Sequence, residues 1–201
     1  MKLEPSGSQT VGPFFTIGLD YLISNAVPEP AIGAQTITVH GRVLDADGIP
    51  VPDAMLELWQ ADPSGHYTSD QRAAVVNKPT ELPGFARLVT DDQGKFRFTT
   101  AKPGSVPFPG AVPSLGAVPF GDGRLQAPHI VVLVFMRGLL RHLITRMYFP
   151  DEPANATDPV LELVPEDRRN TLIARRDPQS AERLEWNILL QGDEETVFFA
   201  W

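Results

Sequence analysis

The chain contains no cysteine and no long run of apolar residues. Without cysteine there is no disulfide, no thiol nucleophile and no sulfur-ligated zinc, so any metal would need oxygen and nitrogen ligands. No apolar stretch approaches the ~20 residues of a membrane-spanning helix, and the amino-terminal region lacks the basic start and apolar core of an export signal. We therefore expect a cytoplasmic protein that neither crosses a membrane nor is exported.

Basic charge is also in the minority. The chain has 17 Lys and Arg against 25 Asp and Glu, which gives a formal net charge of −8, and its arginines are scattered along the sequence. Nucleic-acid binding requires a basic face that neutralises phosphates. The composition therefore predicts no nucleic-acid partner.

Long helical segments are scarce. Twenty prolines and 16 glycines are spread over 201 residues without a period, which favours turns and strands over helices. No internal repeat or linker divides the chain. A length of this order suits one β-sandwich or barrel, so we expect a single domain over residues 1–201.

Apolar side chains alternate along several short segments, as they do in half-buried strands. The turn at 91–94 is predicted to close a hairpin, because alternating segments flank it on both sides and it contains a glycine. The segment 165–176 is the one that looks helical, with proline and acidic residues at its start and arginines at its end. We expect an all-β sandwich with long loops and one short helix, whose strands include 37–43, 55–59, 88–90, 95–99, 130–135, 143–149, 184–190 and 196–201.

Several ordered motifs resemble the intradiol ring-cleavage dioxygenases, and they extend over most of the chain. The resemblance implies the β-sandwich of that family, with residues 1–30 forming an arm that packs on a partner subunit. The matching motifs are SQTVGPFF at 8–15, LWQADPSGHY at 58–67, GKFRFTTAKPG at 94–104, APHI at 127–130 and TRMYF at 145–149.

The family's catalytic chains bind ferric iron through two tyrosines and two histidines, and here the matching positions read Tyr67, Val106, His129 and Val131. Ferric iron prefers phenolate oxygen and imidazole nitrogen, and valine offers no donor. The resemblance therefore implies that Fe(3+) is held by a partner β subunit and that this chain holds no metal. Tyr67 and His129 become structural relics. The other tyrosines and histidines do not restore the set: Tyr21, Tyr148, His40, His66 and His142.

Within the family, the chain looks like the non-catalytic α type, which works in a hetero-oligomer of αβ units. The expected reaction cleaves protocatechuate (3,4-dihydroxybenzoate) with O2 to 3-carboxy-cis,cis-muconate. By resemblance, Thr10, Gly12 and Pro13 line the partner's substrate pocket and Arg137 binds there. A guanidinium is suited to the substrate carboxylate because it offers paired, charge-assisted donors. Arg146 is expected to be a structural ion-pair partner.

Two alternatives stay open at this stage. Without the resemblance, Arg137 would be an ordinary strand-end arginine in a surface ion pair. The chain could also be a non-enzymatic β-sandwich binding or scaffold protein that kept the dioxygenase fold, in which case the segment 10–15 would serve no partner pocket. An independent enzyme with another metal geometry is the weakest possibility, because no other ligand cluster is visible in the sequence.

Overall fold

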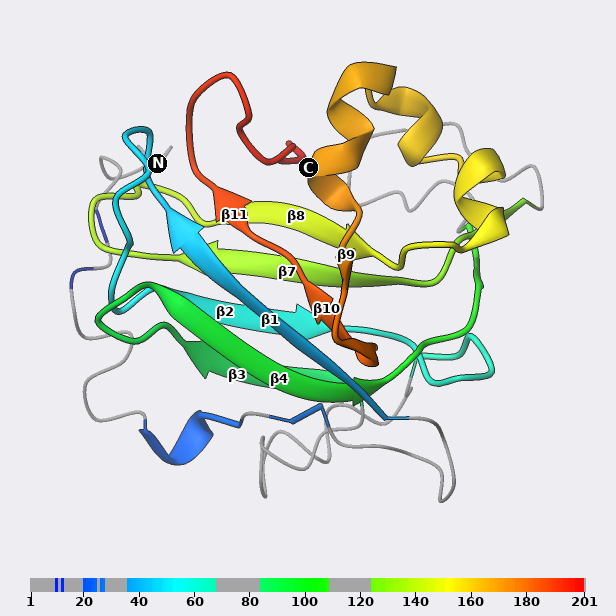
Figure 1. The fold of residues 1–201 in the computed structure, drawn as a ribbon, viewed down its shortest axis with the longest axis horizontal. Helices are drawn as coiled ribbons and strands as arrows, with labels where there is room; N and C mark the ends of the chain where they lie inside the picture. Colours follow the sequence, from blue (N-terminus) through cyan, green and yellow to red (C-terminus); the bar gives the residue numbers. More distant parts are fainter. Residues whose placement is uncertain are drawn as a thin grey trace, which may run out of the picture.

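Two β-sheets packed face to face form the centre of the molecule in the computed structural model, which describes residues 10, 12, 20–24, 26–27, 36–67, 84–108 and 124–200 (Figure 1). The first sheet has the order β11-β1-β10-β9, and β4 pairs with the other side of β1. Its strands are β1 (Thr36–Leu44), β4 (Lys95–Ala101), β9 (Arg175–Asp177), β10 (Ser180–Glu185) and β11 (Ile188–Leu189).

The second sheet has the order β3-β2-β7-β8 and is antiparallel throughout. Burial alternates along its strands, and the inward side chains of both sheets meet in one apolar core that includes Leu56, Phe98 and Ile130. Burying each such side chain contributes about 1.5–3 kcal/mol. The strands are β2 (Met55–Trp59), β3 (Phe85–Val89), β7 (His129–Phe135) and β8 (Leu143–Tyr148).

These strands confirm the sandwich, but the predicted hairpin around 91–94 is wrong. The turn itself forms, since the Gly94 amide donates to the Asp91 carbonyl at 2.8 Å. The flanking strands belong to different sheets, because β3 pairs with β2 whereas β4 pairs with β1. Leu88 and Phe96 face one another across the core, where both are buried. Alternation reveals which side of a strand is apolar, and it does not reveal its pairing partner.

The expected short helix is present as the 3-10 helix Glu166–Leu172. It ends earlier than the charge pattern indicated, and Arg175 and Arg176 begin strand β9. The described residues also form the 3-10 helices Asp20–Leu22, Pro153–Thr157 and Leu161–Leu163, and a two-stranded ribbon joins β5 (Val106–Pro107) to β6 (Leu125–Gln126). No helix among the described residues is long and apolar enough to span a membrane.

The carboxyl-terminal segment does not form the expected closing strand over the described residues 196–200. It is still fixed by hydrogen bonds at both ends, because the Thr196 amide donates to the Leu189 carbonyl at 2.9 Å and the Phe199 amide to the Ile144 carbonyl at 2.8 Å. Isolated bonds of this kind attach a segment without making a ladder. Trp201 lies outside the described residues.

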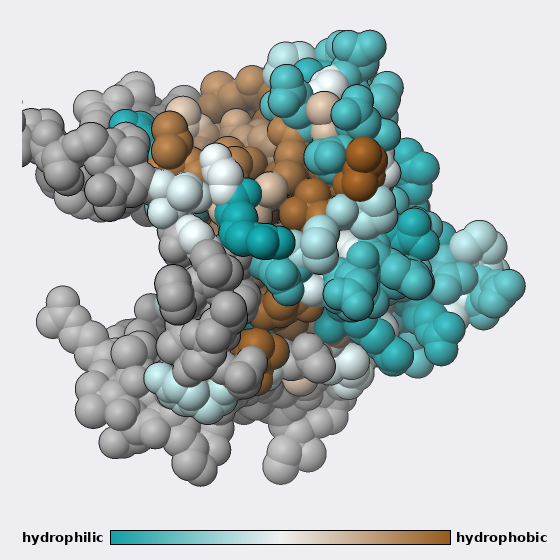
Figure 2. All heavy atoms as spheres, turned by 90° about the vertical axis from the view of Figure 1, so that its left-hand side faces the viewer, coloured by the Kyte–Doolittle hydropathy of each residue, from teal (hydrophilic) through white to brown (hydrophobic). Residues whose placement is uncertain are grey.

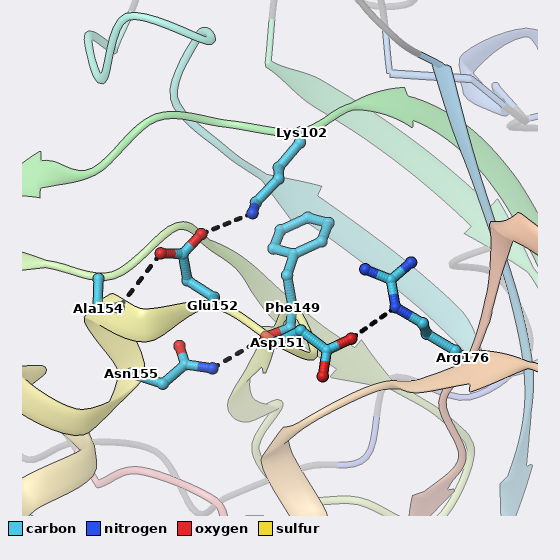
Figure 3. A network of polar contacts seen from close by, with 7 residues as sticks. All are labelled: Lys102, Phe149, Asp151, Glu152, Ala154, Asn155 and Arg176. Atoms are coloured by element: carbon cyan, nitrogen blue, oxygen red, sulfur yellow. Dashed lines mark hydrogen bonds and ion pairs between the residues drawn. The ribbon is translucent and has the colours of Figure 1, made fainter.

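A polar network attaches the 3-10 helical segment to the sandwich (Figure 3). The Lys102 ammonium lies 2.6 Å from a Glu152 carboxylate oxygen, and the other oxygen of Glu152 accepts from the Ala154 amide at the start of a 3-10 helix. Asp151 accepts from the Arg176 guanidinium at 2.6 Å. Together these contacts fix the chain that leaves β8 against both β4 and β9, and so they position the layer that covers the outer face of β7 and β8.

Candidate functional site

The four positions that match the family's iron ligands come from three separate segments. Tyr67 follows the turn after β2, Val106 begins the short ribbon, and His129 and Val131 lie on β7. Residues 130, 132 and 134 face the core, so His129 and Val131 face the other side of the second sheet. His129 is 2% exposed and Tyr67 is 41% exposed. Only two of the four positions carry an atom that could bind iron.

Arg146 lies among these positions, because it is the cross-strand partner of Val131 on β8. It is 8% exposed, and its Nη1 donates to Gln126 Oε1 at 2.7 Å and to the Tyr148 hydroxyl at 3.4 Å. A guanidinium stays charged in proteins. A fixed positive charge therefore occupies the site beside Val131, where the resemblance had led us to expect only a structural ion-pair partner.

Burial is the main influence on the ionisation of the neighbouring side chains, and this guanidinium is the second. Burial, with a further contribution from the positive charge of Arg146, lowers the pKa of His129 to about 3, although the hydrogen bond to the Ala127 carbonyl opposes the shift. Burial raises the pKa of Tyr67 and outweighs the opposing effect of Arg146. Burial also raises the pKa of Tyr148. All three side chains are therefore neutral near pH 7.

A hydrogen bond also determines which nitrogen of His129 carries the proton. Its Nδ1 lies 2.7 Å from the Ala127 carbonyl oxygen, which can only accept, so Nδ1 is protonated and Nε2 keeps the lone pair. The Ala127 amide in turn donates to Asp158 at 2.7 Å. Asp158 also accepts from the Tyr148 hydroxyl at 3.2 Å and from the Val160 amide at 2.8 Å. Protein groups alone thus satisfy the Asp158 carboxylate and the Nδ1 of His129.

The residues of this site do not fit a ferric ion. Two donors remain from the four, and the Arg146 cation beside Val131 would repel a second cation at short range. In the part of the chain that the structure describes, no group of three or more His, Asp or Glu side chains is placed to hold a metal. We derive no metal chemistry from this chain.

Sequence reasoning missed the contribution of Gln126, Arg146 and Asp158 to this site. The alternation of side chains along strands could have placed Arg146 in the site. Once the two strands are paired, positions 146 and 148 lie on the same face of the sheet as positions 131 and 129. Gln126 and Asp158 lie on irregular segments. No periodic pattern in the sequence predicts where they meet.

A second set of predicted residues lies at one end of the sandwich, after β7. The Gly138 amide donates to the Thr10 hydroxyl at 2.9 Å, which brings Thr10 beside Arg137 although 127 positions separate them in the sequence. Arg137 Nη2 lies 3.6 Å from Asp53 Oδ2, and both side chains are 56% exposed. Asp53 adopts a left-handed conformation with φ 59°, which asparagine and aspartate tolerate better than most residues.

The other two predicted members of this set are less defined. Gly12 has a φ of 67° with open space around its Cα, so its conformation favours glycine although no steric contact requires it. Pro13 lies outside the described residues. The structure therefore brings Thr10 and Arg137 together and leaves the placement of the Gly12-Pro13 pair against a substrate as a prediction.

Apolar side chains surround this end of the molecule. Leu140 is 60% exposed, and the segments before and after it contribute half-buried Met136 and Leu143, while Leu190 and Phe198 come from the carboxyl-terminal region. Figure 2 views the end at the left of Figure 1 and shows apolar atoms gathered there beside a polar group of residues. An exposed leucine beside half-buried apolar side chains gives this end an apolar character, which is typical of interaction sites.

Comparison with known proteins identifies relatives over nearly the whole chain. A family model described as Dioxygenase matches residues 22–192. The chain is 38% identical to the protocatechuate 3,4-dioxygenase alpha chain of Burkholderia cepacia, over 98% of both chains. It is 38% identical to the alpha chain of Pseudomonas putida, over 98% of this chain and 96% of that one. It is also 35% identical to the Burkholderia cepacia beta chain, over 94% of this chain and 77% of that one.

Solved structures agree with this fold. The dioxygenase domain of a carbohydrate-binding fusion protein from Streptomyces sp. SirexAA-E superposes with a TM-score of 0.59 at 23% identity, over 94% of this chain and 99% of that one. The 3-chlorocatechol 1,2-dioxygenase of Rhodococcus opacus 1CP superposes with a TM-score of 0.62 at 21% identity, over 92% of this chain and 71% of that one. At these identities the similarity establishes the architecture.

Proposed function

The chain belongs to the intradiol ring-cleavage dioxygenase family, and we propose that it acts as the α subunit of a protocatechuate 3,4-dioxygenase. In this proposal a β subunit holds Fe(3+), and the complex cleaves protocatechuate with O2 to 3-carboxy-cis,cis-muconate. The observation that carries the proposal is the altered iron site. Val106 and Val131 remove two donors and Arg146 adds a buried cation, so the chain keeps the family's fold while its own site is filled by protein.

The two kinds of relative support a division of labour between chains. This sequence aligns with both an alpha chain and a beta chain at more than 30% identity, so the two types share one architecture. Iron is typical of the family, and a chain without an iron site completes its function only beside one that has it. The apolar surface around Leu140 and the adjacent arm residue Thr10 offer a place for such a partner.

We assign the substrate-facing role to Arg137. Protocatechuate carries a carboxylate besides its two hydroxyls, and a guanidinium can donate two charge-assisted hydrogen bonds to it. Asp53 lies beside the guanidinium, and Thr10 fixes the backbone of the next residue through its hydroxyl. Thr10, Gly12 and Pro13 form the arm that we place along the wall of the partner's pocket, with residues 1–30 packing on the partner.

The alternative is a non-enzymatic binding or scaffold protein derived from the same fold. Such a protein would need neither a β subunit nor an arginine at position 137. The alpha-chain and beta-chain relatives support the subunit function instead.

Iron content and colour test the proposal. The chain is purified alone and after co-expression with the β-type dioxygenase gene of the same source, and iron is measured together with the visible spectrum. We expect a colourless, iron-free chain alone and a coloured, iron-loaded complex that consumes protocatechuate. A coloured chain that binds iron by itself would contradict the assignment. An iron-loaded β chain that is equally active without this chain would contradict it as well.

A further inference from the structure

Two turns lie side by side at one end of the second sheet. β2 and β7 are antiparallel neighbours, and Met55 at the start of β2 is opposite Phe135 at the end of β7 (Figure 1). The turn before β2 therefore lies beside the turn after β7. The first turn presents Asp53 and the second presents Arg137, with 3.6 Å between Asp53 Oδ2 and Arg137 Nη2.

A buried side chain holds the turn that carries Asp53. The Thr90 hydroxyl donates to the Val51 carbonyl at 2.8 Å and accepts from the Ala54 amide at 2.9 Å. It thereby bridges the two backbone groups that bond to each other in an ordinary four-residue turn. Thr90 is buried, and its own amide donates to the Ala54 carbonyl at 2.9 Å. The backbone of Asp53 is therefore fixed against the end of β3.

Stability alone does not favour an aspartate at position 53. Asp53 follows Pro52 and has a φ of 59°, which is the pattern of a type II turn, whose third position favours glycine or asparagine because φ is positive. An ion pair between two exposed side chains contributes little to stability, and both partners of this pair are exposed. A residue that departs from the local preference without such a gain is typical of a functional site.

The backbone of Arg137 is also held, whereas its side chain is long and exposed. The Leu139 amide donates to the Met136 carbonyl at 3.4 Å across this turn, and the Gly138 amide donates to the Thr10 hydroxyl. An arginine side chain loses rotamer freedom when it binds a ligand. A carboxylate beside one guanidinium nitrogen reduces that loss before the ligand arrives, and the other donors of the fork stay available.

We propose that Asp53 is a positioning residue for substrate binding, which acts through Arg137. It holds the guanidinium in the orientation in which the remaining donors bind the substrate carboxylate. The inference rests on the proposed function, in which Arg137 faces the partner's pocket. It adds a second side chain of this chain, and the turn that Thr90 fixes, to the groups that set the affinity for an anionic substrate.

Two substitutions of Asp53 in the αβ complex test the proposal. Asp53→Asn removes the charge and keeps a residue that tolerates positive φ. We expect its KM for protocatechuate to rise roughly three- to tenfold while kcat and the iron colour are unchanged. Asp53→Gly should raise KM equally, and its urea unfolding midpoint should stay the same or increase, because glycine adopts positive φ readily. A merely structural role for Asp53 would lower the midpoint and leave KM unchanged.

A double-mutant cycle shows whether Asp53 acts through Arg137. Arg137→Ala should raise KM by itself, and Asp53→Asn should cause no further rise when it is added to Arg137→Ala. Asp151→Asn is the matched control, because Asp151 also has a positive φ, of 55°, and also contacts an exposed arginine, Arg176. This control should leave KM unchanged.

The outcomes separate this inference from the proposed function. A KM that rises in Arg137→Ala but not in Asp53→Asn would overturn the inference alone, and so would effects of the two substitutions that add in full. An unchanged KM in Arg137→Ala would overturn the proposed role of Arg137 and this inference with it.

Discussion

Besides Val106 and Val131, the residue of this chain that bears most on iron binding is Arg146. Its guanidinium lies beside Val131 and within electrostatic reach of Tyr67 and His129. Restoring the missing ligands alone would therefore place a metal next to a buried positive charge. Two positive charges held close together in a buried site repel one another, and this repulsion opposes metal binding even when both missing ligands are restored.

Ligand restoration can be tested with and without that charge. We expect Val106→Tyr with Val131→His to remain iron-free, and the same pair combined with Arg146→Gln to take up ferric iron. Glutamine keeps a donor for Gln126 and removes the charge. Iron stoichiometry and the visible band of a tyrosinate complex report the result. Iron uptake by the variant that retains Arg146 would show that the guanidinium does not exclude the metal.

Arg137 gives a prediction about substrate affinity. In the αβ complex, Arg137→Ala should raise the KM for protocatechuate about 10- to 100-fold, because a hydrogen bond to a charged group contributes roughly 1.5–3 kcal/mol. The iron colour should persist, since the residue does not hold the metal. Arg124→Ala removes another exposed, ion-paired arginine and serves as the control. An unchanged KM in Arg137→Ala would remove this residue from the substrate pocket.

His129 gives a prediction about pH. Its pKa is lowered from 6.5 to about 3 in the folded chain, so the unfolded chain binds a proton first as the pH falls. The contribution of neutral His129 to the free energy of unfolding is therefore complete above about pH 6.5 and declines as the pH falls towards 3. His129→Gln has no such group, and its free energy of unfolding should fall less steeply between pH 7.5 and 4.5. Urea unfolding at a series of pH values measures both slopes, and parallel slopes would contradict the shift.

At the scale of elements, β1 requires the backbone of Trp186 to approach Gly41 closely. A Cβ added to Gly41 would lie 1.7 Å from the carbonyl oxygen of Trp186, and the Trp186 amide donates to the His40 carbonyl at 2.9 Å. Trp186 joins β10 to β11, the two strands that pair with β1 in parallel. No side chain fits at position 41 without separating these strands.

Gly41→Ala should therefore destabilise the chain by roughly 3 kcal/mol or more, near the upper end of single-substitution effects. Gly48→Ala is the matched control, because position 48 has open space and only its φ of 73° is unfavourable, so we expect a loss of about 1 kcal/mol. Urea unfolding midpoints measure both. Equal losses in the two variants would show that β1 can move away from Trp186.

The strands themselves were predictable, because β1 and β2 follow alternating segments, β7 follows a continuous apolar run, and β8 falls where the sequence places it. Their pairing was not, because the turn at 91–94 looks the same whether it closes a hairpin or connects two sheets. Arginines that look scattered in the sequence, such as Arg42 and Arg97, come together on one sheet because strands 50 or more residues apart pair in register.

At the scale of the whole molecule, the apolar end around Leu140 and Arg137 is the surface that we assign to the β subunit. An apolar contact is little affected by salt, whereas contacts between exposed charges are screened. We therefore expect the αβ contact to persist when the salt concentration is raised.

The apolar contact can be tested directly. Leu140→Glu places a charge on the surface proposed to be covered by the β subunit, and we expect at least a tenfold loss of αβ affinity, because a buried unpaired charge is costly. Leu163→Glu changes an equally exposed leucine on a 3-10 helix, at 63% against 60% exposure, and should leave assembly unchanged. Size-exclusion chromatography of co-expressed chains reports both. Normal assembly of Leu140→Glu would place the partner elsewhere.

The parallel pairing of β1 with β10 and β11 also has a consequence for biosynthesis. Residues 38–44 near the start of the chain find their neighbours at 183–189 near its end, and the Arg42 amide donates to the Asn187 side chain across 145 positions. Contacts so distant in sequence make folding slow. While the ribosome is still translating the residues between them, one edge of β1 stays unpaired, and the first sheet closes only after residues 183–189 have been made. A nascent chain is exposed to aggregation over that interval, and truncations before residue 183 should accumulate as insoluble protein.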